Sequence, residues 1–225
     1  MTSKLVLLSA DPAERWCFAL GAVLLEMNGI DFEENYAWSD TDADKAMFCS
    51  GLKRDWGIEN KAGLLEALKG LENDGYQDSF ARDRAFLSTL TAADQNRVIQ
   101  SYANAPAEQR HKELQIVQHY MNRLPAAGIA AWDWGRYSYL CMQGIYLGYV
   151  TKEEALELLR PIALRTQQAY SGWREFATAY LVGRQFWWKQ LTEESAKEMM
   201  GYVQRLLVLP TSPWNTLDWR LPLNA

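Results

Sequence analysis

The chain has 225 residues, of which 48% are hydrophobic and 23% are charged, with 23 lysines and arginines against 28 aspartates and glutamates. This composition is typical of a folded protein with one large domain, or at most two small ones, and excludes a largely disordered chain. The net charge of −5 disfavours general binding to a nucleic-acid backbone, which requires many cations, so no nucleic-acid partner is expected.

The sequence contains no pattern typical of a membrane, metal or cofactor site. The apolar run 5–8 is far too short for a signal peptide, and no stretch approaches the length of a membrane span, so no membrane association is expected and a cytoplasmic location is predicted. The three cysteines (17, 49 and 141) are too scattered for a disulfide framework, and the two histidines lie far from them in sequence. We therefore expect no metal site and no cofactor.

Helix signals follow one another through the first half of the chain. Asp11 followed by Pro12 is a typical helix start, Asn28-Gly29 is a typical end, and Asn60 and Thr91 are candidate caps. Apolar residues recur at intervals of three and four between these signals. The predicted helices cover 12–27, 42–55, 61–75, 78–90 and 92–103.

The second half of the chain predicts five more helices. Thr151 and Glu154 have the spacing of a capping box, and Pro161 is expected to kink or divide the helix that they begin. Ser171 and Thr192 are candidate caps of the last two helices. The predicted helices cover 106–124, 129–147, a segment beginning at 152, 171–190 and 192–208.

The tail, 209–225, contains three prolines together with Trp214 and Trp219. We expect an extended strap with both indoles buried, because exposing them would leave a large apolar area in water. The sequence therefore predicts an all-α fold, a single domain over 1–225 of roughly eight to ten helices with this strap, more than half helical, and no sheet beyond a short hairpin.

Two aromatic segments carry the candidate site, since standard catalytic and nucleotide-binding motifs are absent from the sequence. Asp133 and Arg136 share one face of a predicted helix, and Arg184 falls within an aromatic stripe of another, where its charge needs a carboxylate or a ligand. We expect the two helices to pack together, with Asp133 in salt-bridge reach of Arg184 or Arg136. The candidate residues are Trp132, Asp133, Arg136, Tyr137, Trp173, Tyr180, Arg184 and Trp187.

Two interpretations of these residues stay open. They form either a buried ion-pair network that fixes the register of two helices, or a pocket that holds an anionic or polar ligand. The ten tryptophans, 11 tyrosines and seven phenylalanines favour a core of large rings, with a ring-lined groove for a sugar, a base or a peptide as the alternative.

Several short motifs in the second half occur in a fixed order: Trp132-Asp133-Trp134-Gly135-Arg136, Gly148-Tyr149 followed by Glu153-Glu154-Ala155, Ser171-Gly172-Trp173, Tyr180-Leu181-Val182-Gly183-Arg184, and Ser212-Pro213-Trp214. With 52–71, which contains Trp56-Gly57-Ile58, they resemble a bacterial family known as domain of unknown function 1266, over roughly residues 50–220. Gly172 stands where a second serine is more common. The resemblance implies no activity, substrate or catalytic residue.

Two functional hypotheses follow from the sequence. The first is a bacterial domain that binds another protein, for example as a toxin-neutralising or accessory factor, because tryptophan and tyrosine are good interface anchors. The second is an enzyme or small-ligand binder in which Asp133 is the general acid or base and Arg136 or Arg184 holds an anion. An open cleft with these three residues at its floor would favour the second hypothesis, and burial beneath packed rings would oppose it.

Overall fold

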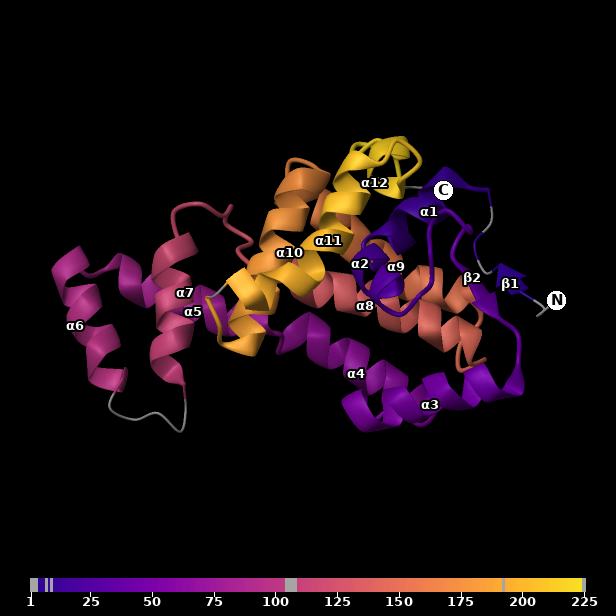
Figure 1. The fold of residues 1–225 in the computed structure, drawn as a ribbon, viewed down its shortest axis with the longest axis horizontal. Helices are drawn as coiled ribbons and strands as arrows, with labels where there is room; N and C mark the ends of the chain where they lie inside the picture. The colour runs from indigo at the N-terminus through magenta and orange to yellow at the C-terminus, as the bar shows by residue number, and fades with distance from the viewer. Residues whose placement is uncertain (1–3, 7, 9, 104–108, 192, 224–225) are drawn as a thin grey trace.

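Helices make up well over half of the chain in the computed structural model, which describes residues 4–6, 8, 10–103, 109–191 and 193–223 (Figure 1). Among these residues ten helices have eight residues or more, as the all-α prediction requires. The helices are α1 (Pro12–Ala19), α2 (Ala22–Met27), α3 (Asp42–Trp56), α4 (Lys61–Asn73), α5 (Tyr76–Ser88), α6 (Ala92–Ala103), α7 (Arg110–Tyr120), α8 (Ala130–Tyr146), α9 (Lys152–Ala169), α10 (Trp173–Trp188), α11 (Glu193–Val208) and α12 (Pro213–Thr216).

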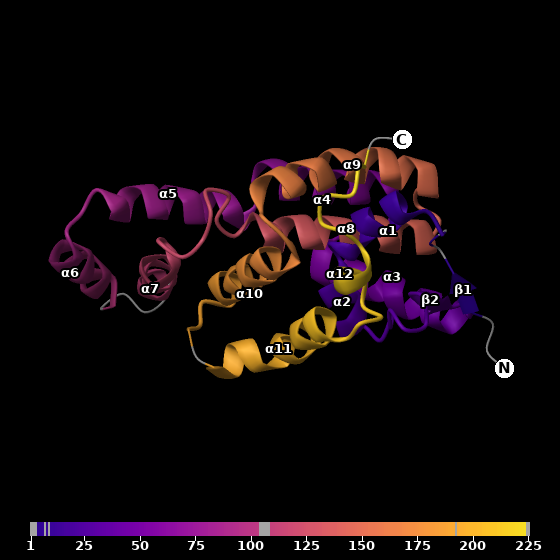
Figure 2. The same ribbon diagram turned by 90° about the horizontal axis from the view of Figure 1, so that it is seen from above.

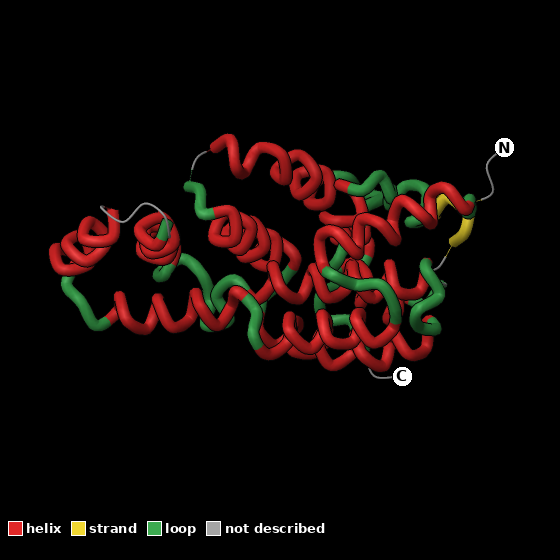
Figure 3. The backbone as a smooth tube through the Cα atoms, turned by 90° about the horizontal axis from the view of Figure 1, so that it is seen from below, coloured by secondary structure: helices red, strands yellow, loops and turns green. Residues whose placement is uncertain are grey.

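Helix α8 lies at the centre of the molecule, with α10, α9 and α4 packed against it (Figures 1 and 2). Sixteen of its seventeen residues are buried, which explains why this segment is so rich in apolar and aromatic side chains. Helices α5, α6 and α7 project at one end of the molecule. At the other end β1 (Lys4–Val6) pairs antiparallel with β2 (Ala37–Ser39), and the tube in Figure 3 shows how small this sheet is beside the helices.

Local capping explains where several helices begin. The side chain of Asn60 accepts a hydrogen bond from the Gly63 N–H at 3.0 Å at the start of α4. Both halves of the predicted capping box are present in α9, where Thr151 Oγ1 accepts from the Glu154 N–H at 3.1 Å and Glu154 Oε2 accepts from the Thr151 N–H at 3.0 Å. These helix starts are confirmed as the sequence predicts them.

The predicted helix over 12–27 is wrong in one respect, because the structure divides it into α1 and α2 near Gly21. A β-carbon at Gly21 would lie only 2.9 Å from the backbone nitrogen of Tyr139, so α8 approaches this point very closely. The hydroxyl of Ser138 also donates to the carbonyl of Cys17 at 3.1 Å. A tertiary contact with α8 therefore competes with the local helical hydrogen bonds.

Two details of the later helices differ from the expectations. Of the kink or division expected at Pro161, the division does not occur, because α9 continues from Lys152 to Ala169. Pro161 has no N–H for the carbonyl of Glu157, and because Glu157 is exposed, water can bond that carbonyl instead. The cap of α10 is Gly172 rather than Ser171. The N–H of Ser171 donates instead to Glu175 Oε2 at 2.6 Å. The proposed starts at Pro106 and Thr192 lie outside the described residues.

The tail packs on the helices as predicted, and α12 forms one short turn within it. Trp214 and Trp219 are 4% and 8% exposed, and their indole N–H groups donate to the carbonyls of Ala19 at 2.9 Å and Tyr170 at 3.0 Å. Trp173 lies between them, with ring centroids 5.6 Å and 4.8 Å away.

Within the described part of the chain, no helix has the length and apolar character needed to cross a membrane.

Candidate functional site

A cavity of about 750 Å³ opens between α3 and the packed pair α8 and α10, and α2 and α11 complete its wall. Four of the eight residues predicted from the sequence line this cavity. They are Trp132, Arg136, Arg184 and Trp187.

Close packing of α8 on α10, as expected, brings the two arginines to one cavity. A β-carbon at Gly183 would lie 2.2 Å from the Cβ of Trp132, and one at Gly135 would lie 2.6 Å from Cε2 of Tyr180. Glycine at these two positions therefore lets the helices approach more closely than any side chain would permit. The ring of Trp132 packs edge-on against Tyr180, with centroids 5.1 Å apart.

Arg136 is 8% exposed, and its guanidinium is held in place from several directions. Nη2 forms an ion pair with Oδ1 of Asp133, so the expected salt bridge is present. The Cζ atom lies 4.8 Å from the ring centroid of Trp132 and 5.4 Å from those of Trp56 and Tyr76. Nη1 makes no hydrogen bond to any residue that the structure describes, so this nitrogen is the donor that Arg136 can offer to a ligand.

Asp133 lies behind the cavity wall and has no exposed surface. Its Oδ2 accepts the Gln77 N–H at 2.8 Å in the first turn of α5, whose cap residue Gly75 has no side chain with which to do so. Burial raises the pKa of Asp133, while Arg136 and the backbone N–H of Gln77 act in the opposite direction. Asp133 thus positions Arg136 and caps α5, and it does not reach the cavity as a general acid or base would have to.

Arg184 is 7% exposed and contacts aromatic rings on the α10 side of the cavity. Its Cζ lies 4.0 Å from the ring centroid of Trp188, 4.6 Å from that of Trp187 and 6.0 Å from that of Trp132. Rings of this kind stabilise a cation through their π faces even where little water reaches it. The cavity therefore has two largely buried guanidinium groups in its wall.

The remaining predicted residues belong to packing rather than to the cavity. The hydroxyl of Tyr137 points away toward α9 and donates to the Leu158 carbonyl at 3.2 Å. Trp173 belongs to the tryptophan cluster of the tail, and Tyr180 is fully buried beneath Trp132. The predicted aromatic stripe of α10 is thus shared between the tail at one end and the cavity at the other.

Two further polar residues of the cavity, Tyr139 and Gln143, follow Arg136 on the same face of α8 and were not predicted. Gln143 Nε2 donates to the Tyr139 hydroxyl oxygen at 2.7 Å. Their spacing of three and seven residues from Arg136 is a signal that could have identified them.

Sequence reasoning also missed the apolar wall of the cavity, which α2, α3 and α11 contribute. Its residues are Leu24, Met27, Met47, Phe48, Leu52 and Met199.

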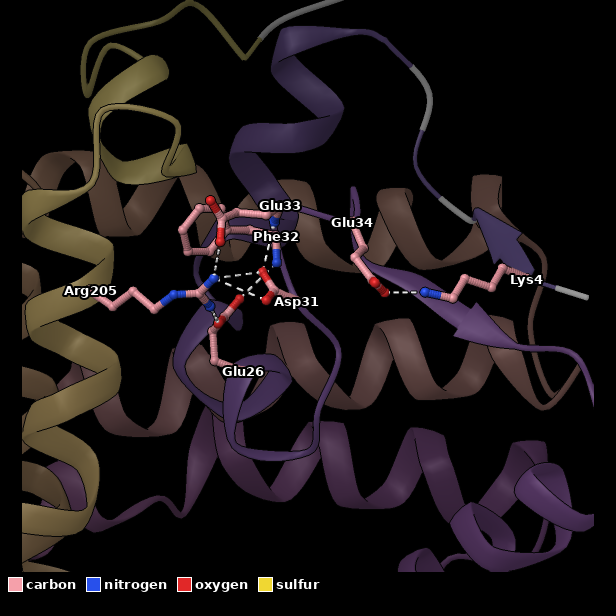
Figure 4. Close-up of polar contacts among 7 residues, drawn as sticks. All are labelled: Lys4, Glu26, Asp31, Phe32, Glu33, Glu34 and Arg205. Atoms are coloured by element: carbon pink, nitrogen blue, oxygen red, sulfur yellow. Dashed lines mark hydrogen bonds and ion pairs between the residues drawn. The ribbon is translucent and has the colours of Figure 1, made fainter. Parts of the chain in front are cut away.

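A second charged cluster holds α11 against α2 and the segment that follows it (Figure 4). Arg205 of α11 forms ion pairs with Glu26, Asp31 and Glu33, and its Cζ lies 4.5 Å from the ring centroid of Phe32. Burial raises the pKa of Glu26 to about 7, although the Phe32 N–H donates to it at 2.8 Å and Arg205 acts in the same lowering direction. Because α2 and α11 both contribute to the apolar wall, this cluster fixes two of its parts relative to each other.

Arginines outnumber acidic residues in the cavity wall. Among the described residues that line it, three are arginines and one is an aspartate; the exposed Arg54 is paired with Asp55 at 2.7 Å, and Arg136 is paired with Asp133 behind the wall. Guanidinium groups bind carboxylates and phosphates through charge-assisted hydrogen bonds. No group of three or more histidines, cysteines or acidic residues that could hold a metal ion occurs in the described part of the chain.

Comparison with known proteins places the chain within a family. The chain is 26% identical to the uncharacterized protein YbeR of Escherichia coli strain K12 over 136 residues, 60% of this chain and 56% of that protein. It is also 26% identical to the uncharacterized protein YbeU of the same strain over 144 residues, 64% of this chain and 60% of that protein, so it spans less than two thirds of either relative. No solved structure matches the chain significantly. The family described as "Protein of unknown function (DUF1266)" matches residues 51–219, and the chain belongs to this family.

Proposed function

We propose that this protein binds a small organic anion in the cavity between α3, α8 and α10. The observation that carries the proposal is the pair of largely buried guanidinium groups, Arg136 and Arg184, in the wall of one open cavity. Asp133 and three aromatic rings hold Arg136 in place, so the group is preorganised before a ligand arrives.

The size of the cavity supports a ligand of ordinary metabolite size. Its volume of about 750 Å³ lies within the range of roughly 300–1,000 Å³ that is typical of small-molecule sites. Apolar and aromatic side chains outnumber polar ones around it, as they do in most such sites.

The geometry favours binding over catalysis and over the protein-partner hypothesis. The candidate acid or base, Asp133, has no exposed surface and is committed to Arg136 and to the start of α5. Of the ten tryptophans, only Trp187 and Trp188 are exposed. Most of the tryptophans that the protein-partner hypothesis places at an interface therefore pack within the protein instead.

The test compares an aromatic acid with an uncharged molecule of similar shape. Isothermal titration calorimetry should show binding of 2-naphthoate but much weaker binding of 2-naphthalenemethanol, because only the acid can use the guanidinium groups. Arg136→Gln and Arg184→Gln should each weaken 2-naphthoate binding about tenfold or more, in line with loss of a charged hydrogen bond. Arg97→Gln is the control, since Arg97 is an exposed residue of α6 that does not line the cavity. Equal affinity for the acid and the alcohol, or for all variants, would contradict the proposal.

A further inference from the structure

We propose that the natural ligand is an amphiphilic carboxylate with a flexible, unbranched alkyl body, bound with its carboxylate at Arg136 and its chain along α2 and the 47–52 part of α3. This inference rests on the proposed function and specifies the class of anion. It follows from how polar and apolar groups are distributed around the cavity and from which ring faces are already engaged.

The polar end of the cavity is at α8. Arg136 is held by Asp133 through Nη2, and Nη1 makes no hydrogen bond to any described residue. Tyr139 and Gln143 continue the same polar face along α8. A carboxylate at this point accepts a charge-assisted hydrogen bond from a group that needs no rearrangement to give it.

The lining contributed by α2, α3 and α11 is mainly apolar and adaptable. Its apolar residues are Leu24 and Met27 of α2, Met47, Phe48 and Leu52 of α3, and Met199 of α11, beside the polar Asn28, Arg54 and Asp55. Half of the six apolar side chains are methionines, which are unbranched and polarizable and adjust to a partner of irregular or variable shape. An alkyl chain matches such a wall because it also bends and gains free energy from every methylene that it buries.

A stacked planar ring fits the cavity less well, although tryptophans line it. Arg136 lies over the rings of Trp132 and Trp56, and Arg184 lies over that of Trp187. Each of these contacts occupies one face of its ring, which leaves less ring surface on which a nucleobase or an aromatic acid could stack. The tryptophans therefore pack against the two cations, and the alkyl body is left to the methionines and leucines.

A series of alkyl carboxylates tests the class of ligand directly. Hexanoate, octanoate and decanoate, each below its micelle concentration, should bind progressively more tightly by calorimetry, by about fourfold for every added methylene. The alcohol 1-decanol should bind at least tenfold more weakly than decanoate, because it lacks the charge. Affinity that does not change with chain length would overturn the inference.

Two matched substitutions locate the alkyl body. Met47 is 59% exposed and lines the cavity, whereas Met200 is 50% exposed and does not. Met47→Glu should weaken decanoate binding at least tenfold, and Met200→Glu should leave it unchanged, while both variants keep the wild-type melting temperature. Because neither residue is buried, this comparison stays valid if Arg136→Gln fails to fold. Equal affinities for the two variants would contradict the proposed position of the chain.

The outcomes separate this inference from the proposed function. Binding of 2-naphthoate that depends on Arg136, with no binding of decanoate, would overturn the alkyl assignment and leave the anion site standing. Failure of every carboxylate to bind the wild-type protein would overturn both. Decanoate binding that depends on chain length, on Met47 and on Arg136 would establish the class.

Discussion

The carboxylate of Asp133 occupies the space that a side chain at position 75 would need. An ideal β-carbon on Gly75 would lie 2.5 Å from Oδ2 of Asp133 and 2.7 Å from its Cγ. Because Gly75 leaves this space empty, Asp133 can accept the Gln77 N–H and still form an ion pair with Arg136. One buried acid thus joins α5 to α8 and orients an arginine of the cavity.

This relationship predicts the effect of a methyl group at position 75. Gly75→Ala should lower the free energy of unfolding by roughly 1–3 kcal/mol, because the new Cβ displaces the carboxylate. The φ angle of Gly75 is −68°, so alanine meets no backbone strain there. Gly70→Ala is the control in α4, where a β-carbon meets no atom within 4 Å, and it should stabilise the helix by about 0.5–1 kcal/mol. Urea denaturation measures both, and a stabilised Gly75→Ala variant would contradict this account.

The ion pair itself can be tested in the same way. Asp133→Ala should cost about 3–5 kcal/mol of unfolding free energy, because it leaves a largely buried guanidinium without its carboxylate. The comparison is Asp55→Ala, which breaks the exposed Arg54–Asp55 pair and should cost about 1 kcal/mol or less. A similar small cost for both substitutions would show that Asp133 is not a buried structural acid.

Glu26 predicts a dependence of stability on pH. Burial raises its pKa to about 7 from an ordinary value of 4.5, so the folded protein binds this proton more tightly than the unfolded chain does. The resulting stabilisation of the folded state is complete below about pH 4.5 and is lost as the pH rises through about 7. At 1.36 kcal/mol per pKa unit, the unfolding free energy changes by about 3 kcal/mol in all.

The test compares wild type with Glu26→Gln, which cannot titrate. The variant should gain unfolding free energy relative to wild type as the pH is raised from 5 to 8, by about 2 kcal/mol or more. Loss of the Arg205 contact changes the unfolding free energy of the variant by a constant amount, which does not affect how that free energy changes with pH. A difference in unfolding free energy between the two proteins that stays constant from pH 5 to pH 8 would contradict a raised pKa at Glu26.

The tail should be essential to the fold. Trp214→Ala and Trp219→Ala each remove a buried indole and its hydrogen bond to a carbonyl, so each should cost about 3–5 kcal/mol. Tyr102→Ala removes an aromatic ring that is 41% exposed on α6 and should change stability by about 0.5 kcal/mol or less. Thermal denaturation distinguishes these cases, and a Trp214→Ala protein that melts like wild type would show that the tail is a dispensable appendage.

The sequence predicts the helices well where their limits are set locally. Asn60 and Thr151 cap their own helices, so their effects can be read from neighbouring residues. The break at Gly21 could not be predicted in this way, because it depends on Tyr139 of a helix that is distant in the chain. Tertiary contact overrides local helix preference at that point.

The candidate site was predictable to a similar extent. Arg136 and Arg184 stood out because charges within aromatic stripes need a partner, and the structure brings both to one cavity. The role of Asp133 as a cap for α5 required knowing that Gly75 lies beside it. Met27, Met47 and Met199 carry no sequence signal that links them, since only the packing of α2, α3 and α11 brings them to the same wall.

The measurement that tests the central claim most directly fills the cavity and asks whether binding is lost. Gly51 lines the cavity and Gly70 does not, yet both lie within helices and a β-carbon at either meets no atom within 4 Å. Gly51→Trp should reduce the affinity for decanoate and 2-naphthoate at least tenfold by calorimetry, because the indole takes the space of the ligand. Gly70→Trp should bind both like wild type, with circular dichroism spectra of the two variants matching that of the wild type. Undiminished binding to a folded Gly51→Trp protein would contradict the claim that this cavity is the anion site.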